Sequence, residues 1–323
     1  MDKTFARWQE VFGQIQEIEG LDSGSLFEQA ERCFYQKWYQ ASKEVAEDEP
    51  ELVQIGGSHI GGLPDLPETL SWPVHEGQAM AFLAQVNCGE LEPNFVPYLP
   101  DQGWLYFFVS APNVWHGIPH QILYFDGYVD ALRQTSLPRD AKTPFAIFKS
   151  HPYRFEAGFS LYSTVFDETF EKRRIDGLID DNMFSKTVDL FQAERDRIGG
   201  FPMSFQPFSE FFAYLALNGF DLMCKYGTSE QYLEYQIERK KLEETDPEHV
   251  KFLRTEVYSQ IREYEKDRDH HRARMKDLRT LLVLGSGGDE MQWGDLGFLQ
   301  FFIFKEDLEK RVFSRTQCDL IST

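Results

Sequence analysis

The chain has 323 residues, 42% of them apolar, with 29 phenylalanines and 14 tyrosines, so it can bury a large core and is not intrinsically disordered. Its 53 acidic and 33 basic residues give a net charge of −20, which argues against nucleic acid and anionic membranes as partners. The N-terminus has no apolar signal segment, and the four cysteines are far apart. We therefore expect a cytoplasmic protein with free thiols.

The first 50 residues are predicted to form two helices that pack on the body. Apolar residues recur at helical spacing over residues 2–19, which predicts an amphipathic helix there. Ser25 and Glu28 have the spacing of a capping box at the start of a second helix, which we expect to continue to about Ala46. The acidic residues 47–49 and Pro50 then end it.

A β-rich region is predicted to begin at Leu52, where short apolar runs are broken by glycine and proline. A short helix is expected around residues 180–193. The predicted strands are 80–87, 104–110, 120–125, 145–148, 153–156, 281–284 and 310–321.

Two sequence blocks occur twice in the same order. Residues 295–303 (DLGFLQFFI) nearly copy residues 101–109 (DQGWLYFFV), and in both copies alternate apolar residues predict a buried strand face. Residues 198–202 (IGGFP) likewise repeat residues 60–64 (IGGLP). We expect one α+β domain over residues 51–323, with a mainly antiparallel, roll-like β body made of two related halves, about 53–125 and 198–303.

The second half is interrupted by a predicted helical hairpin at residues 228–279. Two apolar helical stripes are separated by Thr245, Asp246 and Pro247, which predict a helix cap. This segment holds 13 of the 53 acidic and 12 of the 33 basic residues, so the remaining 40 acids and 21 bases give the rest of the chain a net charge of −19. We expect a solvated insertion that the fold does not need.

The local motifs give no catalytic residue, metal ligand or cofactor site. His116 and His120 have helical metal-ligand spacing, but a glycine and a proline between them rule out that helix. The loop at 285–288 (GSGG) lacks the Lys-Ser/Thr of a phosphate-binding loop, and Ser286 is not within a G-x-S-x-G motif. The sequence therefore favours a protein that is not an enzyme.

The remaining candidates are polar residues beside aromatic ones. Gln85 lies within an apolar strand, so its amide needs either a structural bond to loop backbone, which we favour, or a ligand. Asp289 and Asp295 lie on one loop, but their spacing fixes no distance for acid–base chemistry. The candidate residues for binding a ligand or partner are Asp65, Trp72, Gln85, Asp289, Glu290, Trp293 and Asp295.

Several of these motifs together resemble the YwqG-like family of bacterial proteins, a domain of unknown function. The resemblance rests on I-G-G-x-P-x-L-P followed by Trp72-Pro73, on FLAQVN at 82–87, on LPDQGWLYFF at 99–108, and on the WGD at 293–295 that runs into FFI at 301–303. It covers about residues 51–320, and Gln300 stands where the family more often has tyrosine. The resemblance implies a mostly β, roll-like fold with peripheral helices and no established reaction.

Three functional hypotheses follow. We favour a non-enzymatic module that binds or neutralises a basic protein partner, as an immunity-type protein would. The body charge would steer such a partner, and the resemblance implies similarity to proteins found near bacterial toxin systems. The expected surface is the loop that carries Asp289, Glu290, Trp293 and Asp295, with the region of Asp65 and Trp72 as its match in the other half. The alternatives are an enzyme with an irregular site and a sensor of a small ligand or metal.

Overall fold

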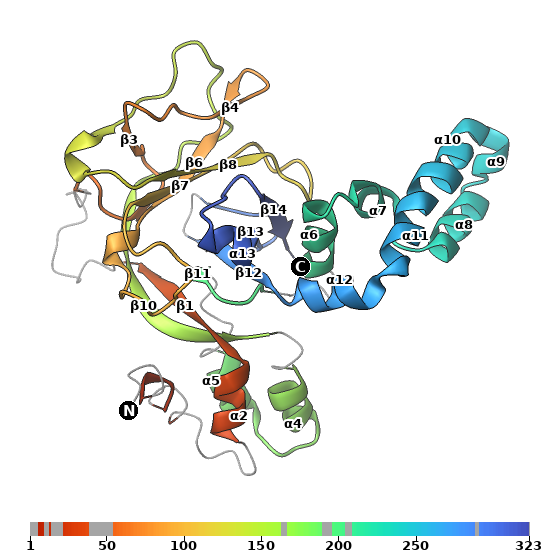
Figure 1. Cartoon of the computed structure of the whole chain (residues 1–323), viewed down its shortest axis with the longest axis horizontal. Helices are drawn as coiled ribbons and strands as arrows, with labels where there is room; N and C mark the ends of the chain where they lie inside the picture. The colour runs from red at the N-terminus through yellow and green to blue at the C-terminus, as the bar shows by residue number, and fades with distance from the viewer. Residues whose placement is uncertain are drawn as a thin grey trace.

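The computed structural model describes residues 6–9, 13, 22–38, 54–162, 167–188, 196–203, 209–287 and 291–322. In these residues the chain forms a nearly closed, barrel-like body of antiparallel strands, with helices around it and a helical arm on one side (Figure 1). The predicted α+β class with a mainly antiparallel body is confirmed. Residues 6–9 and 13 are helical, and the rest of the predicted helix at 2–19 lies outside the described residues.

The main sheet has ten described strands in the order β14-β13-β12-β11-β1-β10-β2-β6-β7-β8, and all neighbours are antiparallel. Two further pairs of short strands lie outside it. The strands of the main sheet are β1 (Ala30–Trp38), β2 (His59–Ile60), β6 (Ala81–Asn87), β7 (Trp104–Val109), β8 (His120–Phe125), β10 (His151–Leu161), β11 (Arg197–Gly199), β12 (Leu278–Gly285), β13 (Phe298–Phe304) and β14 (Thr316–Ile321). The short pairs are β3 (Asp65–Pro67) with β9 (Leu132–Gln134) and β4 (Val74–His75) with β5 (Gln78–Ala79).

Strand β1 is the main departure from the sequence prediction. The second helix, α2 (Ser23–Gln29), ends after seven residues, so its predicted continuation to Ala46 is wrong. The following residues pair with β10 on one side and with β11 on the other, and Cys33 to Tyr35 are all buried. This burial on both faces is typical of a central strand, and the pairing outweighs the helical spacing. The N-cap is Asp22, whose side chain accepts from the Gly24 amide at 3.0 Å.

The strand order is symmetric about the β1–β10 pair. Counted outward from that pair, β2, β6, β7 and β8 on one side correspond in order to β11, β12, β13 and β14 on the other. The registers also match, because a bulge between Phe82 and Ala84 in β6 corresponds to a bulge between Thr280 and Leu282 in β12. Each IGG block is preceded in the chain by a long strand that pairs with the opposite half. Strand β1 precedes the first block and lies beside β11 of the second half, whereas β10 precedes the second block and lies beside β2 of the first half.

The two end strands of the sheet, β8 and β14, approach each other and nearly close the barrel. His120 Nε2 lies 2.8 Å from Thr316 Oγ1. The segment before β8 also bonds to β14, since the Ile118 amide donates to the Cys318 carbonyl at 2.9 Å and the Leu320 amide donates to the Trp115 carbonyl at 2.8 Å. The enclosed face carries the largest apolar cluster, which includes residues of both halves.

The other expected elements are found with some changes. Residues 153–156 lie within the longer β10, and the helix expected at 180–193 is α5 (Asp181–Val188). Residues 145–148 are not a strand. The predicted strand at 310–321 is shorter, because α13 (Lys305–Glu309) and a turn precede β14. The remaining short helices are η1 (Cys88–Glu90), η2 (Val129–Ala131), η3 (Asp167–Glu171), α4 (Lys172–Ile175) and α6 (Ser209–Leu217).

The predicted helical hairpin forms an arm that stands away from the sheet (Figure 1). Its apolar cluster also includes Leu278 of β12 and Phe304 of β13, so the arm is anchored on the edge of the barrel. Ion pairs such as Arg254 with Glu234 at 2.7 Å cross between its helices. Among the described helices, none is long and apolar enough to cross a bilayer. The elements of the arm are α7 (Asp221–Tyr226), α8 (Glu230–Arg239), α9 (Leu242–Thr245), α10 (Pro247–Phe252), η5 (Leu253–Val257), α11 (Tyr258–Lys266) and α12 (Arg268–Met275).

Candidate functional site

Gln85 and Asp65, two of the candidate residues, belong to one buried hydrogen-bond network. The Gln85 Oε1 accepts from the Asp65 amide at 2.8 Å, and its Nε2 donates to the Gly57 carbonyl at 2.9 Å and to Asp65 Oδ2 at 3.2 Å. Asp65 Oδ2 also accepts from the Gly56 amide at 2.8 Å, and Tyr106 Oη donates to the Asp65 carbonyl at 2.7 Å. Both ends of the Gln85 amide are therefore used to hold loop backbone against the sheet.

His59 completes this buried group on the adjacent strand, where it pairs with Gln85 in register. Its Nδ1 lies 2.9 Å from the Gly61 carbonyl, and its ring packs against Phe82 at 5.5 Å between centroids. Burial lowers the pKa of His59, so the imidazole is neutral at physiological pH. The contact between the neutral His59 ring and the Gly61 carbonyl helps to hold the turn of the first IGG block.

Trp72 covers the same side of the sheet. Its ring contacts Phe108 and Phe82, with centroid distances of 5.5 and 6.5 Å, and its indole nitrogen donates to the Met80 carbonyl at 2.9 Å. Only 7% of Trp72 is exposed, so its body packs in the core and its polar end is satisfied internally. The structure thus brings Asp65, Gln85 and Trp72 together in the N-terminal half, as parts of the core.

Trp293 and Asp295 lie in the other half of the chain. Trp293 is 1% exposed and packs edge-on against Phe148, with 5.7 Å between centroids. Asp295 is exposed, and its amide donates to Ser322 Oγ at 3.0 Å. Asp289 and Glu290 lie outside the described residues. The burial of Trp293 contradicts its predicted role as an exposed anchor for a partner.

The strand registers also correct the predicted match between the halves. Asp65 follows the first IGG block, so its counterpart after the second block is Met203 and not a residue of 289–295. The backbone at these two positions is held differently. Tyr106 and Gln85 hold residue 65, whereas Gln300, at the place of Tyr106, donates to the Met203 carbonyl and accepts from its amide, each at 3.0 Å, when its amide is oriented to satisfy both ends. The counterpart of residues 293–297 is 99–103.

The cysteines are poor nucleophiles. All four are free thiols, and Cys33, Cys88 and Cys318 are buried, as the sequence predicted for the chain. Burial raises the pKa of Cys33 to about 11 and that of Cys88 to about 12. Ser286 is also occupied, because its Oγ donates to the Gly297 carbonyl at 2.8 Å and accepts from the Trp293 amide at 2.9 Å.

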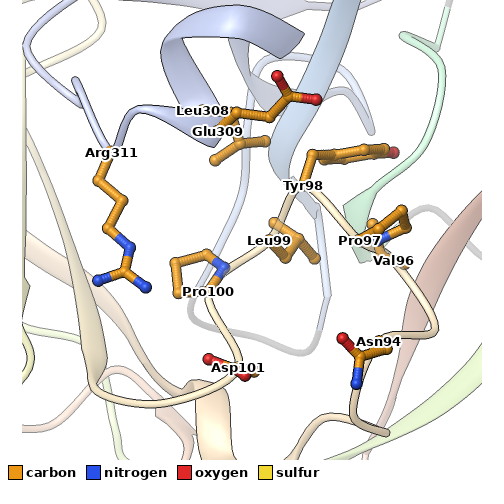
Figure 2. A pocket seen from close by; sticks show the side chains of 10 residues that line it. All are labelled: Asn94, Val96, Pro97, Tyr98, Leu99, Pro100, Asp101, Leu308, Glu309 and Arg311. Carbon is orange, nitrogen blue, oxygen red and sulfur yellow. The ribbon is translucent and has the colours of Figure 1, made fainter.

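A pocket of about 210 Å³ opens beside the counterpart loop, between residues 94–101 and the end of α13 (Figure 2). The surface that it exposes is mainly polar, since Leu99 of the loop is almost fully buried and Leu308 of α13 is fully buried. Both sides of the pocket contribute lining residues. The lining residues are Asn94, Val96, Pro97, Tyr98, Leu99, Pro100, Asp101, Leu308, Glu309 and Arg311.

Arg311 and Asp101 are two opposite charges that line this pocket. Both act electrostatically on the buried Cys88 thiol and on Tyr124, which places them on one side of the pocket. The Arg311 guanidinium lies over the Tyr124 ring, 5.4 Å from its centroid. In the described part of the chain, neither Arg311 nor Asp101 makes an ion pair. Both charges are therefore available to a ligand.

Sequence reasoning missed this pocket, although part of its signal was present. The copied block DQGWLYFFV begins with Asp101, a residue type that is common in turns. Asp101 makes no described hydrogen bond to the backbone amides of its turn. Arg311 carried no signal, because it lies outside both repeated blocks and only the fold brings it to the loop.

The sequence model of DUF1963, a domain of unknown function, matches residues 58–320. The chain belongs to the DUF1963 family. The DUF1963 match begins directly before β2 and extends into β14, so it includes Asp65 and Gln85, the arm and the pocket, and leaves out α2 and β1. No curated protein matches the chain.

Proposed function

We propose that this DUF1963 protein is a binding module that acts by contact with a basic protein partner. The observation that carries the proposal is the outward face of α8, on the projecting arm. Tyr232 and Tyr235 lie one helical turn apart there and are 49% and 56% exposed, while Leu233 and Ile237 on the opposite face fill the arm's own core. Exposed tyrosines with few internal contacts are typical of interface anchors.

The charge distribution supports a basic partner. Residues 228–279 hold 13 of the 53 acids and 12 of the 33 bases, so the rest of the chain carries a net charge of −19. A field of this sign accelerates encounter with a basic protein, and short-range contacts then fix the complex. The nearly neutral arm supplies contact area and the acidic body supplies attraction. The resemblance to YwqG-like proteins, with their similarity to proteins near toxin systems, makes a neutralising role the specific form of this hypothesis.

The proposal is tested by capture from a lysate of the native cells with the full chain as bait. The double variant Tyr232→Ser/Tyr235→Ser removes both exposed rings and leaves the buried face of α8 intact. Tyr128→Ser is the matched control, because Tyr128 is 86% exposed on the body. We expect a basic protein that wild type and the control retain in stoichiometric amount, that the double variant binds at least about tenfold more weakly, and that high salt releases.

Two outcomes would overturn the proposal. One is the absence of any stoichiometric protein on the wild-type bait at low salt. The other is equal retention of the captured protein by wild type and by the double variant, which would exclude the arm as the contact surface. Far-UV circular dichroism of both variants shows whether α8 remains helical, so that a loss of capture is assigned to the missing rings.

A further inference from the structure

Arg197, on β11, is a buried guanidinium that has no counter-charge among the described residues. Only 2% of the residue is exposed. Its Nη2 donates to the Phe201 carbonyl, whereas its Nε has no hydrogen-bond partner in the described structure. None of the ion pairs between described residues includes Arg197. Because arginine stays charged in proteins and a buried unpaired charge is costly, an anion is the partner that this position favours.

The strands on both sides of Arg197 supply no negative charge. Its register partners are Tyr35 on β1 and Val283 on β12. The next residue, Ile198, belongs to the apolar cluster inside the barrel, so Arg197 projects from the opposite face of the strand. On that face Val283 packs with Met203 in a second apolar cluster. The guanidinium therefore has a tyrosine on one side and an apolar cluster on the other.

Two acids in the region of Arg197 have other partners. Asp196 precedes it in the chain, and its side chain accepts from a backbone amide of β12. Glu31 acts electrostatically, as Arg197 does, on the buried Cys33 thiol, but its carboxylate pairs with Arg279 at 2.6 Å. Neither acid is therefore the counter-charge of the Arg197 guanidinium.

The matching position in the other half of the chain has a neutral residue. His59 and Arg197 each directly precede an IGG block. The Nδ1 of the neutral His59 lies 2.9 Å from the Gly61 carbonyl, and Asp65 acts on the ring electrostatically. The counterpart of Asp65 is Met203, so the acid is missing from the half that has the permanent positive charge. Since the fold accommodates a neutral side chain at this position, packing alone does not account for the charge of Arg197.

We propose that Arg197 binds a small monovalent anion, such as chloride or the carboxylate of a small organic acid, on the outer face of β11. The anion accepts a hydrogen bond from the unpartnered Nε–H and neutralises the guanidinium. Because Arg197 is almost fully buried, the bound anion is enclosed, and its size is limited to a few heavy atoms. The anion binds the folded chain alone, since unfolding exposes Arg197 to water, and it therefore stabilises the fold.

Urea unfolding of the full chain at increasing sodium chloride tests the proposal. Sodium gluconate keeps the ionic strength constant, because an enclosed site excludes its bulky anion. If one chloride ion binds the folded chain, the equilibrium constant of unfolding should fall about tenfold for each tenfold rise in chloride above the dissociation constant. A parallel series with sodium acetate distinguishes a halide from a carboxylate as the ligand.

Two variants test the residue. Arg197→His introduces the side chain that the matching position already accommodates, and Arg197→Gln removes the charge with little change in length. At about pH 8, where an ordinary histidine is neutral, we expect both to lose the dependence on the anion. Arg133→His is the matched control, because Arg133 is exposed on β9, and it should respond as wild type does.

The proposal is overturned if neither chloride nor acetate changes the unfolding of wild type at constant ionic strength. It is also overturned if Arg197→His or Arg197→Gln folds and still responds as wild type does, since the response would then be a general effect of the salt on the protein surface. A response to only one of the two anions supports the proposal and identifies the ligand class. Capture by the arm is a separate result, because Arg197 lies outside the arm.

Discussion

Phe107 and Phe301 meet edge-on inside the barrel, with 5.4 Å between their ring centroids. They occupy matching positions, because Phe107 pairs with Ala84 in β6 directly after its bulge and Phe301 pairs with Leu282 in β12 directly after its bulge. Both are fully buried. The contact therefore joins equivalent points of the two sides of the sheet, and it supports the hypothesis of an internal duplication.

Truncation of either ring should destabilise the barrel strongly. We expect Phe107→Ala and Phe301→Ala each to lower the free energy of unfolding by about 3 to 5 kcal/mol, because each leaves a cavity in the shared core. The double variant should cost less than the sum of the two, with a coupling of about 0.5 to 1.5 kcal/mol from the ring contact. Urea unfolding of the four proteins measures this. Strict additivity would show that the two rings do not stabilise each other.

Gln85 should matter for stability through its hydrogen bonds. Gln85→Leu keeps most of the side-chain volume but leaves the Asp65 amide and the Gly57 carbonyl without their partner. We expect a loss of about 1 to 3 kcal/mol for each buried group left unpaired. Gln121→Ala, at an exposed position of β8, is the control and should change stability by less than about 0.5 kcal/mol. An unchanged urea midpoint for Gln85→Leu would contradict the structural role of this amide.

Stability should fall in mild acid because of two buried histidines. Burial lowers the pKa of His59 and of His120 below the ordinary value of 6.5. Below pH 6.5 the unfolded chain therefore binds protons that the folded chain does not, and the free energy of unfolding decreases as the pH falls toward the folded pKa values. Burial raises the pKa of Glu210 above 4.5, which has the opposite effect, since it favours the folded state as the pH falls toward 4.5.

Urea unfolding at about pH 7.5 and about pH 5.5 measures the net effect of the two histidines and Glu210 on the free energy of unfolding. We expect lower stability at the acid pH and a smaller difference between the two pH values for His120→Gln. His270→Gln is the control, because His270 is exposed on α12. A pH dependence identical in wild type and His120→Gln would show that the barrel-closing histidine is not responsible.

Deletion of the arm should be tolerated if the deletion leaves β12 intact. Among the described residues, three of the four apolar clusters contain none from 229–275, and the arm's cluster reaches the barrel strands through Leu278 and Phe304. Replacement of 229–275 by a short Gly/Ser linker should therefore uncover these two side chains and still leave a cooperatively folded barrel. A longer cut of 228–279 also removes the buried Leu278 and Arg279, and Arg279 pairs with Glu31 at 2.6 Å. That longer cut should not fold. Near-UV circular dichroism and urea unfolding of both deletions check this. Loss of the near-UV signal or of cooperative unfolding in the shorter deletion would show that the barrel needs the arm in order to fold.

The sequence predicted the outer strands well because their signals are local. Alternation and flanking turns located β6, β7 and β8 within a residue or two. The prediction failed at β1. The apolar residues there have helical spacing, but pairing with β10 and β11, which lie far along the chain, holds the segment in an extended conformation. The sequence also placed Trp72 and Trp293 on a binding surface, because the sequence of a polar loop does not show whether its aromatic side chain packs into the core. The pocket depends on Arg311, which only the fold brings to Asp101.

The position of β1 has a consequence for the order in which the protein can be made. Ala30–Trp38 pairs with β10, whose Leu161 lies opposite Ala30, and with β11 at residues 197–199. The ribosome releases β1 long before either partner strand exists, so the early chain carries a segment whose backbone lacks its strand partners and whose Cys33 and Phe34 are not yet buried. Such long-range pairings fold slowly, and open strand edges favour aggregation. Protection of the nascent N-terminal segment by a chaperone would then limit the yield of folded protein more than the stability of the finished barrel does.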